Sequence, residues 1–157
     1  RFVQDGLARG YVIGFVGGSD SHNCFDSMTC EWGLTGVYAK ALTPQSVIEA
    51  MRLRRTFALT GGRTVLDFRC NGRLMGGEVV AHGTLAFKAY TCSQDSIVSA
   101  QIISDGKPVF EREARAPEVT FEWETSAPAA PAYYYLRART AKGDYAWSSP
   151  IWVHPAP

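Results

Sequence analysis

The period of the hydrophobic residues changes near residue 63, and this change constrains the fold more than any other feature of the chain. From Arg63 onward hydrophobic and polar residues alternate, and turn sequences separate the alternating stretches. A period of two buries one face of a β-strand. The predicted strands are 65–71, 85–91, 97–104, 107–111, 119–124, 132–140 and 145–153. About seven short antiparallel strands predict an immunoglobulin-like β-sandwich over residues 63–157.

The phase of these strands predicts which side chains face the core. Tyr134, Leu136 and Ala138 share the core phase of their strand. Cys70 shares the phase of the hydrophobic residues before it, whereas Cys92 is out of phase with its neighbours. We therefore expect Cys70 to be a core thiol and not to form a disulfide with Cys92.

Turn residues mark several strand boundaries. Asn71-Gly72, Ser104–Lys107 and Lys142–Asp144 are hairpin or turn sequences, because Gly, Asn and Asp adopt the backbone conformations that tight turns require. Ser148-Ser149-Pro150 interrupts the last predicted strand. It predicts a bulge or a strand switch that fixes the final strand.

The first part of the chain has α/β signals instead. Tyr11–Val16 is an apolar run of buried-strand length, and Gly17-Gly18 lets the backbone turn sharply after it. Thr43 is a good N-cap and Pro44 suits the first position of a helix. The expected elements are a helix at 2–9, strands at 11–16 and 34–39, and a helix at 44–54.

Asp20 and His22 follow the glycine turn and are the candidate metal ligands. Because they are two residues apart, their side chains point the same way on an extended strand end and can bind one metal ion or two adjacent ones. Carboxylate and imidazole suit Zn, Mn or Fe, and such ions can lower the pKa of a bound water enough to form hydroxide near neutral pH. By itself the tripeptide also fits a turn in which Asp20 caps a backbone amide.

Longer strings give these two residues a context. The strings are G-F-V-G-G-S-D-S-H-N, W-G-L-T-G-V-Y-A, L-T-P-Q-S-V-I-E-A-M-R-L-R-R-T-F-A-L-T-G, L-D-F-R-C-N-G-R-L-M-G and Y-A-W-S-S-P-I-W-V. Together they resemble the C-terminal end of PHP-domain proteins, the polymerase and histidinol phosphatase superfamily, in the branch of hydrolases that carry a C-terminal β domain. The resemblance covers nearly the whole chain.

The resemblance implies a fold and an activity. The expected fold class is α+β, with residues 1–62 as the C-terminal strand-helix remnant of a PHP α/β barrel and residues 63–157 as the antiparallel sandwich. The parent protein is expected to be a metal-dependent phosphoesterase, in which metal-activated water attacks a phosphoester or a related amide or carbamate bond. Asp20 and His22 match the late Asp-x-His ligand pair of the family residue by residue.

The other ligands of the family, among them an N-terminal His-x-His, are absent from this sequence. Because the chain begins with Arg1 rather than Met, we expect a preceding segment of the natural protein to carry them. A catalytic metal centre needs about three protein ligands. The expectation is therefore that the full-length protein binds a divalent metal (Mn, Zn or Fe), and that the fragment alone is inactive and requires the missing segment as its partner.

Arg54 and Arg55, at the end of the predicted helix, are the candidate substrate-binding residues. Guanidinium groups form bidentate hydrogen bonds to phosphate. The family-like string R-R-T places Arg55 where the helix returns toward the strand ends. The alternative is structural, with the arginines complementing the helix dipole and forming ion pairs.

Two further hypotheses concern binding. Cys24 and Cys30 together with His22 suggest zinc, but their spacing fits no established zinc motif, which favours free thiols or a local disulfide. The aromatic residues of residues 63–157 suggest a non-catalytic module that binds a partner or a carbohydrate. In such a module Asp20 and His22 would be a vestigial metal site. The platforms of the module would be Tyr133, Tyr135, Trp147 and Trp152. Aromatic residues of a sandwich more often pack in the core and at its edges, so we interpret both tryptophans as structural.

Charge and composition exclude some classes of partner. The net charge of the 157 residues is +1 with acids and bases interspersed, so nucleic-acid binding is not indicated. No apolar run approaches the roughly 20 residues that a membrane span needs. Apolar residues of the first part, such as Val12, Phe15 and Val16, need a partner, which is the sandwich, a second copy of the chain or the missing segment. The sequence leaves the substrate and the compartment open.

Overall fold

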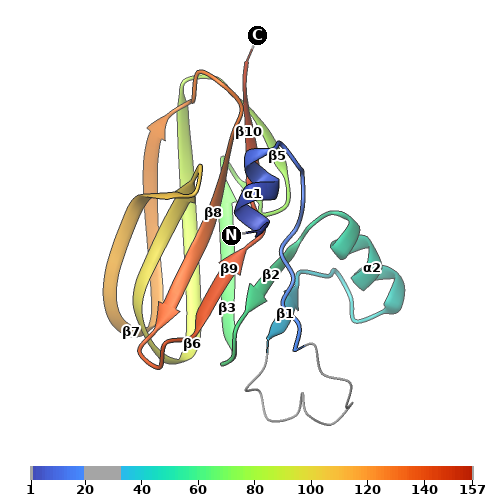
Figure 1. Ribbon diagram of the computed structural model, residues 1–157, viewed down its shortest axis with the longest axis vertical. Coiled ribbons are helices and arrows are strands. Elements are labelled where there is room, and N and C mark those ends of the chain that lie inside the picture. The colour runs from blue at the N-terminus through green and yellow to red at the C-terminus, as the bar shows by residue number, and fades with distance from the viewer. Residues whose placement is uncertain (1, 20–32, 157) are drawn as a thin grey trace.

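The computed structural model describes residues 2–19 and 33–156, which form one curled sheet with two helices outside it (Figure 1). The helices are α1 (Phe2–Ala8) and α2 (Pro44–Arg52). The strands are β1 (Leu34–Val37), β2 (Thr56–Leu59), β3 (Thr64–Cys70), β4 (Arg73–Leu74), β5 (Glu78–Ala81), β6 (Thr84–Ser104), β7 (Lys107–Ser126), β8 (Ala132–Thr140), β9 (Tyr145–Ser148) and β10 (Ile151–Pro155). Neither helix of this described part has the length and apolar character that crossing a membrane requires.

Strand β6 organises the sheet because it pairs with different strands along its length. Its first part pairs with β3, and its second part, from Ile97 to Ser104, pairs with β8 on the same edge. β7 follows β6 along the other edge as a long hairpin partner. The register of β6 against β7 shifts between Cys92 and Ile97, and such irregularities bend a strand. The sheet accordingly curls into half a barrel (Figure 1).

The inside of the curl holds the hydrophobic core. Leu66, Phe68 and Cys70 of β3 alternate with more exposed residues and have no exposed surface. The Phe68 ring stacks on Phe87 of β6, with 5.6 Å between the ring centroids. Cys70 is a free thiol, and burial raises its pKa to about 11. The predicted core thiol is therefore confirmed, as are the predicted core residues of β8, which are Tyr134, Leu136 and Ala138.

The last predicted strand is interrupted at Ser149-Pro150, which separates β9 from β10. Both strands pair with β8 on one side, but on the other side β9 pairs with β2 and β10 pairs in parallel with β5. Side-chain hydroxyls satisfy the backbone at the break, since Ser148 Oγ accepts from the Leu136 amide at 2.9 Å. The Ser149 hydroxyl lies 3.0 Å from the Thr56 hydroxyl. The predicted strand switch is confirmed.

The other face of β8, β9 and β10, which we call the outer face, is covered by α1 and residues 11–17 (Figure 1). Tyr133, Tyr135 and Trp152 of this face are buried and cluster with Leu7 of α1 and with Phe15. The Phe15 ring meets Tyr135 edge to face at 5.3 Å between centroids. These aromatic residues pack against the N-terminal part of the protein, which supports their structural interpretation over an open carbohydrate platform.

The prediction of an α/β-barrel remnant in residues 1–62 is wrong for the described residues. β1 and β2 pair antiparallel and belong to the same sheet as the later strands, whereas a barrel remnant would contribute parallel strands flanked by helices. Tyr11–Val16 is not a strand, because its backbone has no neighbouring strand in this part of the chain. An apolar run by itself does not distinguish a strand from another partly buried segment.

The prediction of an immunoglobulin-like sandwich is also wrong, although the β-rich, mostly antiparallel character is confirmed. The four stretches predicted between residues 85 and 124 are two long strands, β6 and β7. Residues 92–96 and 112–118 contain no glycine, and the chain passes through them as irregular strand rather than as turns. The alternation also misses β2, β4 and β5, which are only two to four residues long.

Gly76 and Gly72 offer a matched test of the packing before β5. Both have positive φ, at 83° and 79°, but a Cβ at Gly76 would stand 2.2 Å from the Arg54 carbonyl oxygen, whereas a Cβ at Gly72 would meet nothing within 4 Å. We expect Gly72→Ala to lower the free energy of unfolding by about 1 kcal/mol through the left-handed backbone alone. Gly76→Ala is expected to cost about 3 kcal/mol or more. Urea unfolding measures both losses, and equal losses would contradict the described packing.

Candidate functional site

Arg54 and Arg55 lie in a pocket of about 770 Å³ between the end of α2 and the segment that leads from β3 to β5. Residues 53–55 form one wall, and the end of β3 with residues 71–78 forms the other. The charged residues of the lining are Arg54, Arg55, Arg69, Arg73 and Glu78. We call this hollow the arginine pocket.

Local sequence explains how the two walls approach each other. α2 ends at Arg52, and Arg54 then adopts a left-handed φ of 57°, a position that glycine usually occupies. An L-residue in this conformation costs about 1–2 kcal/mol. On the facing wall Asn71-Gly72 forms the tight turn between β3 and β4 that the sequence predicts. Gly76 then comes so close to the Arg54 carbonyl that any side chain would clash.

The side chain of Arg54 ties the two walls together. Its Nε donates to the Gly76 carbonyl at 3.0 Å, and its Nη2 lies 3.5 Å from a carboxylate oxygen of Glu78. The guanidinium stands over the ring of Trp152, 5.2 Å from its centroid, where cation–π attraction operates. These contacts offset the cost of the left-handed backbone. Much of the bonding capacity of Arg54 is therefore used within the protein.

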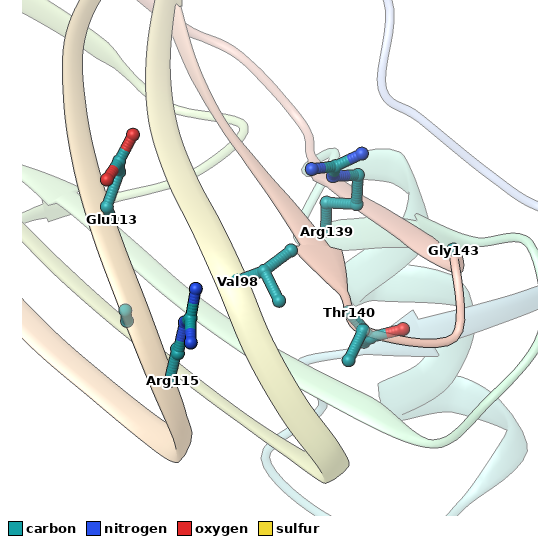
Figure 2. A pocket seen from close by; sticks show the side chains of 8 residues that line it. Val98, Glu113, Arg115, Arg139, Thr140 and Gly143 are labelled. Atoms are coloured by element: carbon teal, nitrogen blue, oxygen red, sulfur yellow. The ribbon is translucent and has the colours of Figure 1, made fainter.

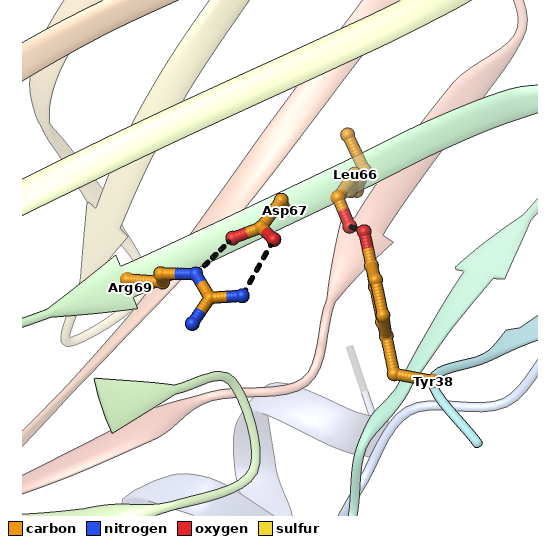
Figure 3. Close-up of polar contacts among 4 residues, drawn as sticks. All are labelled: Tyr38, Leu66, Asp67 and Arg69. Atoms are coloured by element: carbon orange, nitrogen blue, oxygen red, sulfur yellow. Dashed lines mark hydrogen bonds and ion pairs between the residues drawn. The ribbon is translucent and has the colours of Figure 1, made fainter. Parts of the chain in front are cut away.

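Arg69 is also paired. Figure 3 shows its Nε and Nη2 on the two carboxylate oxygens of Asp67, at 2.8 and 2.9 Å. The hydrogen bond to Asp67 raises the pKa of Arg69 above its usual value. Beside this pair the Tyr38 hydroxyl donates to the Leu66 carbonyl at 2.7 Å, and burial followed by the Asp67 charge raises the pKa of Tyr38 to about 12. Arg69 thus lines the pocket with its charge balanced.

Arg55 and Arg73 differ from the other two arginines. Neither side chain forms an ion pair within residues 2–19 and 33–156. Arg55 is half-buried, and its backbone is held by hydrogen bonds of 2.9 Å to Ala50 and to Tyr38. Arg73 is exposed at the start of β4. The two arginines give the pocket an excess of positive charge.

This arrangement favours an anion with several oxygens. Arginine presents five N–H donors in a planar fork that matches phosphate or carboxylate, and it has no lone pair to offer a metal ion. Within the described ranges no group of three or more His, Cys, Asp and Glu side chains could hold a metal ion. The pocket can therefore bind an anionic ligand through its arginine side chains.

A second hollow, of about 650 Å³, lies along β6, β7 and the end of β8. Figure 2 shows Glu113 and Arg115 of β7 on one side of it and Arg139 of β8 on the other. Arg139 also lines a smaller adjoining hollow together with Glu111. Because carboxylates accompany the arginines here, the positive excess is smaller than in the arginine pocket.

The predicted metal ligands lie outside the described residues. Asp20 and His22 belong to the range 20–32, as do Cys24 and Cys30 of the zinc hypothesis. The metal-binding hypothesis therefore stays a prediction.

The chain that leads toward the predicted metal ligands is described as far as Ser19, and it lies against the start of β1. Thr35 Oγ1 accepts from the Gly17 amide at 2.9 Å and donates to the Gly17 carbonyl at 2.7 Å. A Cβ at Gly17 would stand 2.3 Å from the carbonyl oxygen of Leu34, so this approach needs glycine. Arg55 lies beyond the other end of β1, where its carbonyl accepts from the Tyr38 amide. Four residues of strand span about 14 Å, so the described chain does not bring Arg55 next to Gly17.

Arg69 and Arg73 are the pocket arginines that the sequence did not single out. They lie on either side of the Asn71-Gly72 turn, in the string L-D-F-R-C-N-G-R-L-M-G. A tight turn brings the residues before and after it onto neighbouring strands, and the register pairs Cys70 with Arg73. The sequence signal that could have placed these two arginines close together is a predicted tight turn with an arginine on each side.

Comparisons with known proteins give relatives whose names state no function. No family model matches the chain. The chain is similar to uncharacterized proteins of Chlamydia muridarum (28% identical), Chlamydia trachomatis serovar D (29% identical) and Chlamydia pneumoniae (27% identical). Each match covers 96% of this chain and 28% of the relative. The chain thus spans little more than a quarter of the length of these relatives.

Proposed function

We propose that this chain binds a phosphate-bearing ligand in the arginine pocket and is the ligand-contacting part of a longer protein. The observation that carries the proposal is the presence of Arg55 and Arg73, which have no ion-pair partner in the described part of the chain, in one pocket with two further arginines. The short span of the chain within its relatives supports a role inside a larger protein.

The paired and the unpaired arginines have different roles in this proposal. Arg54 and Arg69 already bond to Glu78 and Asp67, so they shape the pocket and limit its affinity. Arg55 and Arg73 supply the donors for the ligand. A hydrogen bond to a charged group contributes about 1.5–3 kcal/mol, and solvent screening at the exposed Arg73 favours the lower end. Two such contacts correspond to binding of a single phosphate group in about the millimolar range.

A second proposal concerns the longer protein. It is a metal-dependent phosphoester hydrolase in which Asp20 and His22 are two of the ligands of a divalent metal. The resemblance of the G-S-D-S-H string supports this proposal, as does the close approach of Gly17 to β1, which holds the chain in place three residues before Asp20. The arginine pocket would then bind an anionic part of the substrate.

Calorimetric titration with inorganic phosphate and with phenyl phosphate tests the arginine pocket. Arg55→Ala and Arg73→Ala are each expected to weaken binding about tenfold, because each loses about 1.4 kcal/mol of charge-assisted hydrogen bonding. Arg52→Ala is the matched control, since it removes the same charge from the exposed end of α2, outside the pocket. It should change the affinity by less than about twofold. Equal weakening in all three variants would indicate general attraction by positive charge and would contradict a site.

Metal analysis of the longer protein tests the second proposal. Asp20→Ala and His22→Ala are each expected to lower the affinity for Mn²⁺ or Zn²⁺ by more than about tenfold, since even the loss of a group that only orients a ligand costs that much. His82→Ala, which changes an exposed histidine between β5 and β6, is the control and should leave the affinity unchanged. Unchanged metal content in the Asp20 and His22 variants would favour the alternative of a non-catalytic binding module.

A further inference from the structure

Residues 12–16 follow α1 along the outer face toward β1 without pairing to a strand (Figure 1). The Phe15 amide donates to the Ser149 hydroxyl at 2.8 Å. No backbone–backbone hydrogen bond joins residues 12–16 to the rest of the described chain. A segment of strand length therefore has backbone donors and acceptors that remain free to pair with another strand.

This segment has apolar side chains on both of its faces. Ile13 and Phe15 pack on the outer face of the sheet, and Phe15 is buried there. Val12 and Val16, at the alternate positions, are 47% and 61% exposed. Apolar residues on both faces are typical of a strand that is covered on both sides. The sheet covers one of these faces, and Arg54 lies close to Gly14 in the middle of the segment.

The exposed side adjoins further apolar surface, because Val3 of α1 and Val16 line the same crevice. Phe2, Val3 and Tyr11 are 88%, 49% and 59% exposed, and they belong to α1 or to the turn after it. A crevice of about 520 Å³ runs beside them, with Ile13 and Trp147 in its lining. Apolar surface that is gathered in one place commonly marks an interaction site.

We propose that a β-strand from the part of the longer protein outside this sequence pairs with residues 12–16 and covers Val12 and Val16. A strand fits better than a helix or a small ligand, because an added strand satisfies unpaired backbone groups and apolar side chains together. The relatives are long enough to contain such a strand outside the matched region, since that region is only 28% of each relative. The inference rests on the proposal that this chain is part of a longer protein, and it does not depend on ligand binding in the arginine pocket.

Amide hydrogen exchange, followed by mass spectrometry, tests the proposal by comparing the longer protein with this chain alone. The buried core of β3, β6 and β8 lies entirely within the chain, so the chain alone provides a folded reference. Amides of residues 12–16 are expected to exchange at least about 100-fold more slowly in the longer protein, whereas those of β8 exchange alike in both. Equal exchange of residues 12–16 in the two proteins would overturn the proposal.

Val16→Asp and Val80→Asp are matched variants, because both valines are 61% exposed and Val80 lies on β5. In the longer protein Val16→Asp should return the exchange of residues 12–16 to the rate seen in the chain alone, and Val80→Asp should leave it slow. Sedimentation of the chain alone measures its oligomeric state. A dimer in which residues 12–16 are protected from exchange would identify a second copy of the chain as the occupant and overturn the proposal. Protection that survives Val16→Asp would do the same.

Discussion

The break between β9 and β10 at Ser149-Pro150 holds the two walls of the arginine pocket together. β9 pairs with β2, which begins directly after Arg55, and β10 pairs with β5, which begins directly after Gly77. Across the break the Pro150 carbonyl accepts from the Gly76 amide at 2.8 Å. Since β8 carries both β9 and β10 on one edge, the two walls keep a fixed separation. The pocket is a consequence of how one broken strand distributes its neighbours.

The charges of the pocket follow from this frame. Arg54 adopts a left-handed backbone conformation on one wall, and its guanidinium group forms an ion pair with Glu78 on the other wall. Strained backbone of this kind persists where surrounding contacts compensate for it, and it is common at functional sites. Arg69 is neutralised by Asp67 on its own strand. Arg55 is half-buried, and no carboxylate of the described chain balances its charge, so we assign it to ligand binding.

The sequence predicts what local interactions determine. The N-cap of α2 is an example, since the Ser46 amide donates to the Thr43 hydroxyl at 3.3 Å as the Thr-Pro pair indicates. The side chains of β3 and β8 that face the core are also predicted correctly, because alternation along a strand is a local pattern. The parallel pairing of Glu78 with Trp152 depends on residues far apart in the chain, and no periodicity of either segment encodes it. Tyr11–Val16 has the composition of a strand but lacks a partner in the described chain, so composition alone led to a wrong element.

The residues of the candidate site were likewise predicted only where local sequence determines them. Arg54 and Arg55 could be predicted as pocket residues because a helix end is a local feature of the sequence. Predicting Arg73 requires the three-dimensional fold, in which the β3–β4 turn faces that helix end. Asp20 and His22 remain a prediction from resemblance.

Oxyanion binding in the pocket that the broken strand supports can be observed in a crystal structure of the chain grown with inorganic phosphate. We expect a phosphate ion within hydrogen-bond distance of the guanidinium groups of both Arg55 and Arg73. Phosphate bound at other surface arginines and not at these two would contradict it.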